Sequence, residues 1–253
     1  MDHQEKTRAP AIDRCVGIME YLQDNPPSTI SEISKATGIP LSSMYVLADS
    51  MRVHGLLRQD ENGRLHLWMK LISLGRSAAE KMDIGDLVRP ALLSLMDAVD
   101  CLAVHYGIMN GSEAYYAIKI ERPGSGMQIR SREGMSVSLV HAGLGKCLLA
   151  FQDADPRARI IDSLDFTKAT PTSIGSPEEL RKELATIRLQ KWAFDNSEGE
   201  SGIRCVAVPV FDKGGKLLGA VSIVGTITAF TDDKIPGIVA LSKECSKNIT
   251  NSL

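Results

Sequence analysis

The feature that most constrains the fold is a pair of short helical segments, separated by a brief turn and followed directly by two short strands, within residues 28–67. Thr29 and Glu32 form a capping-box pattern, in which each side chain satisfies the backbone amide of the other residue at a helix start. Gly38 stands where this helix would end, because glycine readily adopts the left-handed backbone of a helix C-terminus. A second segment with helical spacing covers residues 42–54. This order predicts a helix-turn-helix.

Helical spacing also indicates which side chains of this region would face a core. We expect a preceding helix to start near Pro10 and to end before Pro26, because proline cannot continue a helix. The inward positions expected in the three helices are Ile12, Val16, Met19 and Leu22, then Ile30, Ile33 and Ala36, and then Met44, Leu47 and Met51.

Two short apolar segments, residues 56–60 and 64–67, flank a loop that contains Asn62 and Gly63. Asn-Gly predicts a type I′ hairpin turn, since both residues tolerate the positive φ that this turn requires. A hairpin directly after a helix-turn-helix is a wing, so residues 1–67 are expected to form a winged helix-turn-helix that binds DNA. Two alternatives stay open: a small helical subdomain that binds no nucleic acid, and a module that binds another protein.

The charge of the chain does not favour DNA binding. Its formal net charge is −2, and residues 1–81 contain ten Lys or Arg and ten Asp or Glu. DNA-binding domains usually carry a basic face, because contacts with phosphates dominate their affinity. Net charge ignores where the charges lie, so this observation counts against DNA binding without excluding it.

Composition excludes several other classes. A chain of 253 residues is long enough for two domains. Its five cysteines form no Cys-x-x-Cys pair and its histidines no His-Glu-x-x-His motif, so neither a disulfide framework, a metal site nor a metal cofactor is expected. The polar N-terminus and the lack of an apolar run of about 18–20 residues predict a cytoplasmic protein that does not enter a membrane.

The remainder of the chain suggests a connecting helix over residues 68–82 and a second domain over residues 83–253. Leu71, Leu74 and Ala78 would lie on one side of the connecting helix. A further helix over residues 86–99 would have its inward positions at Leu87, Ala91, Leu95 and Val99. Strands are expected at 101–109, 114–120, 127–130, 135–139, 205–211 and 216–224, and helices from Gly143, over 177–189 and after a capping Thr231. Hairpins with helices outside them predict an antiparallel α+β sensor domain.

Several motifs in this order resemble those of the isocitrate lyase regulator (IclR) family of bacterial transcription factors, over nearly the whole chain. The similar stretches are Ile33–Ser43, Gly55, Asn62-Gly63-Arg64, Leu74-Gly75, Gly134, Gly145-Lys146-Cys147-Leu148-Leu149-Ala150, Thr170-Pro171-Thr172, Lys191–Asp195 with Glu198, and Gly202–Val210. The resemblance implies a GAF/PAS-like effector domain with an antiparallel sheet, and a homodimer or dimer of dimers. It also implies allosteric control of operator binding by a small organic molecule, commonly a carboxylate, and no enzyme activity. The working assignment is a repressor, although repression and activation both depend on operator position, which lies outside the sequence.

Candidate DNA contacts follow from the helix-turn-helix, whose second helix docks in the major groove. The base-contact candidates are Ser42, Ser43 and Tyr45, and the phosphate-contact candidates are Arg64 on the wing with Arg8 and Arg14 near the first helix. Arg52, further along the second helix, is a further DNA-contact candidate. For each of these arginines taken alone, a solvated surface charge is the commoner role. The chain departs from the family pattern at Val46, where arginine is frequent, at Trp68, where a wing-end glycine is usual, and at Ser138, where a proline is usual.

Candidate effector contacts begin with Gly143, Leu144 and Gly145. A phosphate-binding P-loop is excluded here, because Val140 and Cys147 occupy positions that need a glycine and a hydroxyl. A glycine turn that opens a helix can still bind a carboxylate through free amides, although these glycines could serve packing alone. The resemblance adds Asp195, Cys205 and Ser222 as polar ligand contacts and places Val224 where a second serine is frequent.

Val224 removes one hydroxyl, and an unpaired buried polar group costs roughly 1–3 kcal/mol. We therefore expect an acid with an apolar or aromatic substituent rather than a bare two-carbon oxoacid such as glyoxylate. Each of the three polar candidates also has a purely structural interpretation. Asp195 could be a turn residue and Ser222 could fill space, while Cys205 could be a small buried hydrophobe. A catalytic Cys205 would need a positioned base, and no histidine is near it in sequence.

Overall fold

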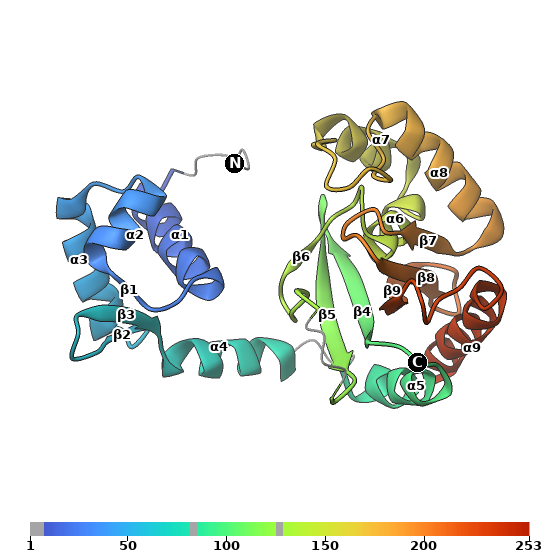
Figure 1. Ribbon diagram of the computed structural model, residues 1–253, viewed down its shortest axis with the longest axis horizontal. Helices are drawn as coiled ribbons and strands as arrows, with labels where there is room; N and C mark the ends of the chain where they lie inside the picture. The colour runs from blue at the N-terminus through green and yellow to red at the C-terminus, as the bar shows by residue number, and fades with distance from the viewer. Residues whose placement is uncertain (1–7, 81–84, 125–128, 253) are drawn as a thin grey trace. The chain divides into compact units, whose positions relative to one another are not determined.

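The computed structural model describes residues 8–80, 85–124 and 129–252, and the chain divides into two compact units, Met1–Met82 and Asp83–Leu253 (Figure 1). The break expected near residues 82–84, and with it the boundary between the connecting helix and the second domain, lies outside the described residues.

The N-terminal unit contains a winged helix-turn-helix. Its elements are α1 (Pro10–Asp24), β1 (Ser28–Thr29), α2 (Ile30–Thr37), α3 (Leu41–Val53), β2 (Leu57–Gln59), β3 (Arg64–Leu67) and α4 (Met69–Glu80). The capping box is present: the Thr29 side chain accepts from the Glu32 amide and the Glu32 carboxylate accepts from the Thr29 amide at 2.7 Å. Gly38 has φ +70° and ends α2. The three strands pair antiparallel in the order β1-β3-β2.

The core of this unit corrects part of the expected helix faces. Its buried side chains are Ile18, Leu22, Ile33, Ile39, Met44, Ala48, Met51, Leu57 and Leu65. Ile12 is exposed because α1 turns Ile18 and Leu22 inward instead. Ala36 is also exposed: α2 ends one residue later, and Ile39 fills the core from beyond the turn.

The wing hairpin forms, but the expected type I′ turn is wrong. Gly63 has φ +75°, whereas Asn62 is not in the left-handed region. The Asp60 carboxylate accepts from the amides of Asn62 and Arg64, at 3.0 and 2.8 Å. A three-residue loop that ends in a left-handed glycine is the alternative hairpin geometry. The Asp60 side chain stabilises it by satisfying two loop amides.

The second unit contains a six-stranded antiparallel sheet in the order β6-β5-β4-β9-β8-β7. Its strands are β4 (Ala103–Asn110), β5 (Glu113–Glu121), β6 (Ser136–Val137), β7 (Ala193–Asn196), β8 (Ile203–Phe211) and β9 (Leu217–Thr226). Its helices are α5 (Gly85–Ala98), α6 (Gly143–Ala150), α7 (Ala154–Ser163), α8 (Pro177–Gln190) and α9 (Ile235–Ser252). The predicted α+β class with a helix-turn-helix and an antiparallel sheet is confirmed.

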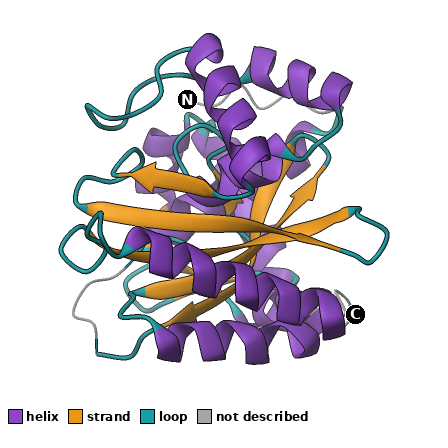
Figure 2. Ribbon diagram, turned by 90° about the vertical axis from the view of Figure 1, so that its right-hand side faces the viewer, coloured by secondary structure: helices purple, strands orange, loops and turns teal. Residues whose placement is uncertain are grey.

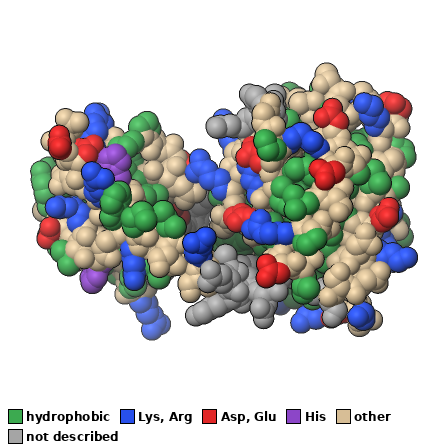
Figure 3. Space-filling model, turned by 90° about the horizontal axis from the view of Figure 1, so that it is seen from below, with side chains coloured by type: hydrophobic (Ala, Val, Ile, Leu, Met, Phe, Trp, Pro, Cys, Tyr) green, Lys and Arg blue, Asp and Glu red, His purple; other side chains and the backbone are tan. Residues whose placement is uncertain are grey.

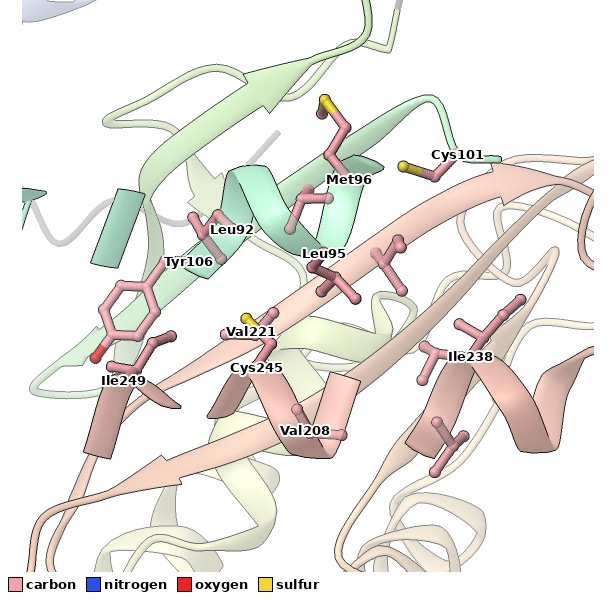
Figure 4. Packing of buried hydrophobic residues seen from close by; sticks show 14 of the residues in the cluster. Leu92, Leu95, Met96, Cys101, Tyr106, Val208, Val221, Ile238, Cys245 and Ile249 are labelled. Atoms are coloured by element: carbon pink, nitrogen blue, oxygen red, sulfur yellow. The ribbon is translucent and has the colours of Figure 1, made fainter. Parts of the chain in front are cut away.

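Helices cover both faces of this sheet (Figure 2). α5 and α9 pack on one face, where the buried core includes Leu92, Leu95, Tyr106, Val208, Val221, Cys245 and Ile249 (Figure 4). α6 packs on the opposite face, and α8 packs against α6 (Figure 2). The two faces therefore have separate cores, and the second core includes Leu144, Cys147 and Leu148.

Sequence reasoning missed α7 and β7, and it misplaced several other features. The strand expected at 127–130 falls partly outside the described residues, and residues 129–130 form no strand. In α5 the inward face includes Val88 and Leu92, so the expected inward Leu87 is exposed. In α4 the expected inward Leu74 and Ala78 are exposed.

Candidate functional site

Three of the predicted effector residues lie side by side on adjacent strands. Asp195 of β7 pairs in register with Cys205 of β8, and Cys205 pairs with Val224 of β9. Val224 pairs in turn with Ala103 of β4. Residues paired across neighbouring antiparallel strands point to the same face of the sheet. This first row therefore presents a carboxyl, a thiol and an apolar side chain together.

A second row lies two residues further along the same face. It contains Ser222 of β9, which pairs with His105 of β4, and His105 pairs with Lys119 of β5. Sequence reasoning predicted Ser222 but missed His105. The alternation of Ala103, His105 and Gly107 along β4 would have placed this imidazole on the same face, because side chains two apart in a strand share a face.

The N-terminus of α6 meets the first row. A Cβ placed on Gly143 would lie 3.2 Å from the Sγ of Cys205 and 3.5 Å from the Cβ of Asp195. The N-cap residue Ala142 has no side chain that could cap the helix. The backbone amide of Leu144 lies near Cys205 and lowers the pKa of its thiol. The first turn of α6 therefore lies directly against the carboxyl of Asp195 and the thiol of Cys205.

Gly145 has a different role. A Cβ placed there would lie 2.0 Å from the carbonyl oxygen of Ser138, closer than any real contact allows. This glycine permits α6 to pack against the preceding chain. The Ser138 hydroxyl accepts from the His141 amide at 3.0 Å and orders the turn that leads into the helix. Of the two glycines, Gly143 faces the candidate site and Gly145 serves packing.

A chain of polar contacts joins the two rows. The Ser131 hydroxyl lies 2.8 Å from Nε2 of His105, and Nδ1 of His105 lies 3.4 Å from the Ser222 hydroxyl. Ser222 in turn lies close enough to Cys205 to lower the pKa of its thiol. Burial, and next the charge of Lys119, lowers the pKa of His105 to about 3, so the imidazole is neutral at physiological pH. A neutral imidazole has one donor and one acceptor nitrogen, which the two serines match.

Tyr116 also borders the site, with its ring centroid 4.9 Å from that of His105. Burial is the main cause of a raised pKa for Tyr116, and the nearby Cys205 and Asp195 add to it. Neither Tyr116 nor Ser131 was predicted. Ser131 lies outside any helix or strand, so only the tertiary fold brings it to His105.

Asp195 lies in β7, directly before a buried turn. It is 8% exposed, and its Oδ1 accepts from the Glu198 amide at 2.7 Å. Burial raises its pKa to about 7 and outweighs the hydrogen bonds and the Lys146 charge, which lower the pKa. Near neutral pH this carboxyl can thus either donate a hydrogen bond as the acid or accept one as the carboxylate.

Lys146 supports this turn from inside. Its side chain is fully buried, and its Nζ donates to Glu198 Oε1 at 2.6 Å, to the Phe194 carbonyl at 2.7 Å and to Glu183 Oε1 at 3.3 Å. The resemblance located this lysine by its motif without assigning it a contact. All three of its donors therefore serve the protein itself, and Lys146 joins α6, α8 and the chain after β7.

Hydroxyls fix the same turn from the other side. Ser197 has φ +62°, an unusual conformation for a residue with a side chain. Its carbonyl accepts from the hydroxyls of Thr170 and Thr172, at 2.7 and 2.9 Å, and the Ser173 hydroxyl donates to the Glu198 carbonyl at 2.6 Å. The Thr-Pro-Thr motif thus holds the turn that follows Asp195 and β7.

The surroundings of Cys205 do not favour nucleophilic chemistry. Burial, with the Asp195 charge, raises its pKa to about 12, so the group is a thiol at neutral pH. A nucleophilic cysteine needs a thiolate. Within the described residues, no three His, Cys, Asp or Glu side chains are grouped to hold a metal ion.

The candidate DNA contacts of α3 lie on its solvent side. Ser42 and Tyr45 are exposed and Ser43 is half-buried, opposite the buried Met44 and Ala48. Arg14 of α1 donates to the Ser43 hydroxyl at 3.5 Å. The structure therefore brings Arg14 together with the first turn of this helix.

Three other arginine candidates are placed differently. Arg64 donates to the Pro27 carbonyl at 2.8 Å and lies 3.6 Å from the Glu32 carboxylate, so it ties the wing to α2. Arg52 lies 3.7 Å from Asp49. Arg8 is exposed ahead of α1.

An arginine that was not predicted lies near the end of the wing. The Arg58 guanidinium is 4.8 Å from the centroid of the Trp68 ring, a cation–π geometry. This contact gives the unusual Trp68 a structural role. On the face in Figure 3, basic side chains are scattered among apolar and acidic ones.

Two family models match the chain. The model described as the IclR helix-turn-helix domain matches residues 11–61, and the model described as the bacterial transcriptional regulator IclR C-terminal matches residues 76–251. Among curated proteins, the HTH-type transcriptional regulator RhmR of Escherichia coli K12, itself described as uncharacterized, is 37% identical over 249 residues. That alignment covers 98% of this chain and 95% of RhmR.

Solved structures have the same architecture. The Thermotoga maritima IclR structure is 29% identical, has a TM-score of 0.76 and covers 97% of this chain and 99% of that one. An IclR homologue from Microbacterium hydrocarbonoxydans, solved in complex with 4-hydroxybenzoate, is 19% identical and has a TM-score of 0.80. The alignment covers 96% of this chain and 98% of that one. At this identity the likeness shows a shared fold and nothing about function. Within the described part of the chain, helices are too short or too polar to cross a membrane.

Proposed function

The chain belongs to the IclR family of bacterial transcriptional regulators, which are not enzymes, and from this premise we propose that a small organic acid controls its binding to operator DNA. The DNA-binding helix-turn-helix and the C-terminal effector domain belong to the family assignment. The nature of the effector, the residues that bind it and the residues that contact DNA are the proposal.

One observation carries the effector proposal: the position of Gly143 against Cys205 and Asp195. The uncapped first turn of a helix offers backbone amides and a positive dipole end, which favour an anion. A carboxylate placed there would contact the amides of Gly143 and Leu144. Protonated Asp195 would donate to it, and the thiol of Cys205 and the hydroxyl of Ser222 would complete its surroundings.

The rest of the site favours an acid with an apolar or aromatic part. Val224 occupies the first row between Cys205 and Ala103, and the Tyr116 ring borders the second row. An aromatic or aliphatic group would pack on these side chains and leave no polar group unpaired. The Microbacterium homologue binds 4-hydroxybenzoate, so this aromatic acid is a reasonable first probe.

On the DNA side, we propose that Ser42, Ser43 and Tyr45 contact bases and that Arg14 and Arg8 contact phosphates. Arg52 extends this surface toward the end of α3. Arg64 would act chiefly by fixing the wing, because it is already bonded to α2 and to the preceding turn.

Self-association is part of the proposal. Three large apolar side chains of α4 are exposed in the single chain: Met69, Ile72 and Leu74. Burying them against a second copy would remove apolar surface from water. A homodimer would also present two recognition helices to a palindromic operator of double-stranded DNA. We propose that the protein acts there as a repressor.

The test is a gel-shift titration with the DNA upstream of the protein's own gene. Specific retardation that weakens steeply with salt supports a DNA-binding regulator. No retardation even at low salt would overturn DNA binding and favour a protein-binding module. Calorimetric titration with 4-hydroxybenzoate and glyoxylate then tests the effector class, and tighter glyoxylate binding would contradict it.

A further inference from the structure

Val46 stands at the centre of the outward face of α3. The buried side chains of this helix are Met44, Ala48 and Met51. At 100° per residue, Val46 points almost directly away from them, and it is 70% exposed. It is the sixth residue of the helix that docks in the major groove, within the half that reaches base edges.

The neighbours of Val46 on the helix surface are all short and polar. The residues three and four positions away are Ser42, Ser43, Asp49 and Ser50. Residues at these spacings flank a side chain on a helix. None of them is long enough to cover the two methyl groups of Val46, which therefore project beyond their surroundings.

Helix stability does not explain a valine here. A β-branched residue is a poorer helix former than alanine, and an exposed side chain gains nothing from packing. Its χ1 angle, however, is almost fixed in a helix. The methyl groups are thus held in one place before any partner binds, which lowers the entropy lost on contact.

We propose that Val46 reads the C5-methyl group of a thymine in the operator. In the major groove, thymine is the base that presents a methyl group, and apolar side chains recognise it by contact. An arginine would read guanine at this place instead. The inference rests on the proposed DNA binding and adds a base preference that the polar contacts do not supply.

The experiment starts by selecting operators from random DNA with the full-length protein. Each thymine of the selected site is then replaced in turn by deoxyuridine, which removes only the methyl group. We expect one substitution per half-site to weaken binding about fourfold, the value for one buried methyl-sized group. Val46→Ala should bind the thymine and deoxyuridine operators equally.

Val53→Ala is the matched control. Val53 lies on the same stripe of α3 and is 78% exposed, but it is the last residue of the helix. This variant should keep the full thymine preference. The thermal unfolding temperature of Val46→Ala should equal or exceed that of the wild type. This measurement excludes misfolding as the cause of weaker binding.

The outcomes separate the inference from the function on which it rests. Selected operators without thymine, equal binding of every deoxyuridine operator by the wild type, or a preserved preference in Val46→Ala would each overturn the methyl readout. Failure to select any DNA sequence would instead overturn DNA binding itself.

Discussion

The Cα of Gly143 faces Cys205 so closely that a Cβ added to the glycine would lie 3.2 Å from the Sγ. This contact places the amino end of α6 against the first of two neighbouring rows of the sheet. The rows contain four buried groups that differ in chemistry: the Asp195 carboxyl, the Cys205 thiol, the Ser222 hydroxyl and the His105 imidazole. The proposed effector site depends on this geometry.

The two glycines of α6 should respond differently to substitution. Gly143→Ala adds a methyl group at a tight but tolerable distance from Cys205, so the fold should persist while effector binding weakens. Gly145→Ala places a Cβ 2.0 Å from the Ser138 carbonyl oxygen. We expect this overpacking to cost about 1–3 kcal/mol or more of unfolding free energy. Urea unfolding of both variants checks the order, and equal losses would contradict the separate roles.

Stability should depend on pH through Asp195. Its pKa is about 7 in the folded state, well above the ordinary value of 3.8, so the folded state keeps a proton that the unfolded state releases between these values. Stability from this group is therefore complete below pH 3.8 and is lost as pH rises to about 7.

Asp195→Asn removes this titration and retains an oxygen that can accept from the Glu198 amide. As pH rises from 4 to 8, the unfolding free energy of the variant should increase relative to that of wild type by more than about 1 kcal/mol. Thermal unfolding across this range is the measurement. A wild-type-to-variant difference that does not change with pH would show that Asp195 does not titrate there.

His105 should contribute to stability with the opposite dependence on pH. Its pKa falls from 6.5 to about 3 on folding. The unfolded state thus binds a proton first, and stability decreases as pH falls below 6.5. His105→Leu should remove this dependence.

The free energy of unfolding of the same variant should be about 1–3 kcal/mol lower than that of wild type at pH 7.5, because Ser131 and Ser222 lose the His105 imidazole as their partner. His54→Leu, at an exposed position of the N-terminal unit, is the control and should have little effect. Urea titrations at pH 5 and pH 7.5 test both statements. A His105→Leu protein as stable as wild type would refute the buried hydrogen-bond chain.

Substitution of Lys146 should destabilise the fold far more than substitution of a surface lysine. Lys146→Ala leaves the Glu198 carboxylate buried without its partner, and breaking a buried pair typically costs about 3–5 kcal/mol. The double variant Lys146→Met and Glu198→Gln removes both charges and should recover part of this loss. Denaturation of the single and double variants gives the coupling. Additive effects would show that the two groups do not act as a pair.

The sequence predicted those parts of the fold that local chemistry determines. The capping box at Thr29, the glycine at position 38 and the hairpin around Gly63 could each be recognised, because the residues that define them are adjacent in the chain. The turn type was wrong since it depends on the Asp60 side chain, which competes for the loop amides. Ile12 and Ala36 were misassigned because helix rotation is set by tertiary packing.

The candidate site was predicted in part. The resemblance located Asp195, Cys205 and Ser222, and the structure places them on two adjacent rows of one face. His105 could have been found from strand alternation. Ser131 could not, because it reaches the imidazole from 26 residues away in the sequence. Which of the two α6 glycines faces the site likewise required the position of Ser138.

Control of operator binding by an organic acid is tested most directly by the affinity of the protein for selected operator DNA. This affinity is measured by fluorescence anisotropy with and without saturating organic acid. The acid is taken from a thermal-shift screen that begins with 4-hydroxybenzoate; a ligand at 100 times its Kd stabilises by about 2.7 kcal/mol. For the wild type, we expect the acid to change the operator Kd at least about fivefold. For Gly143→Ala we expect little or no change. An operator affinity that a bound acid leaves unchanged, or a full response in Gly143→Ala, would contradict allosteric control through this site.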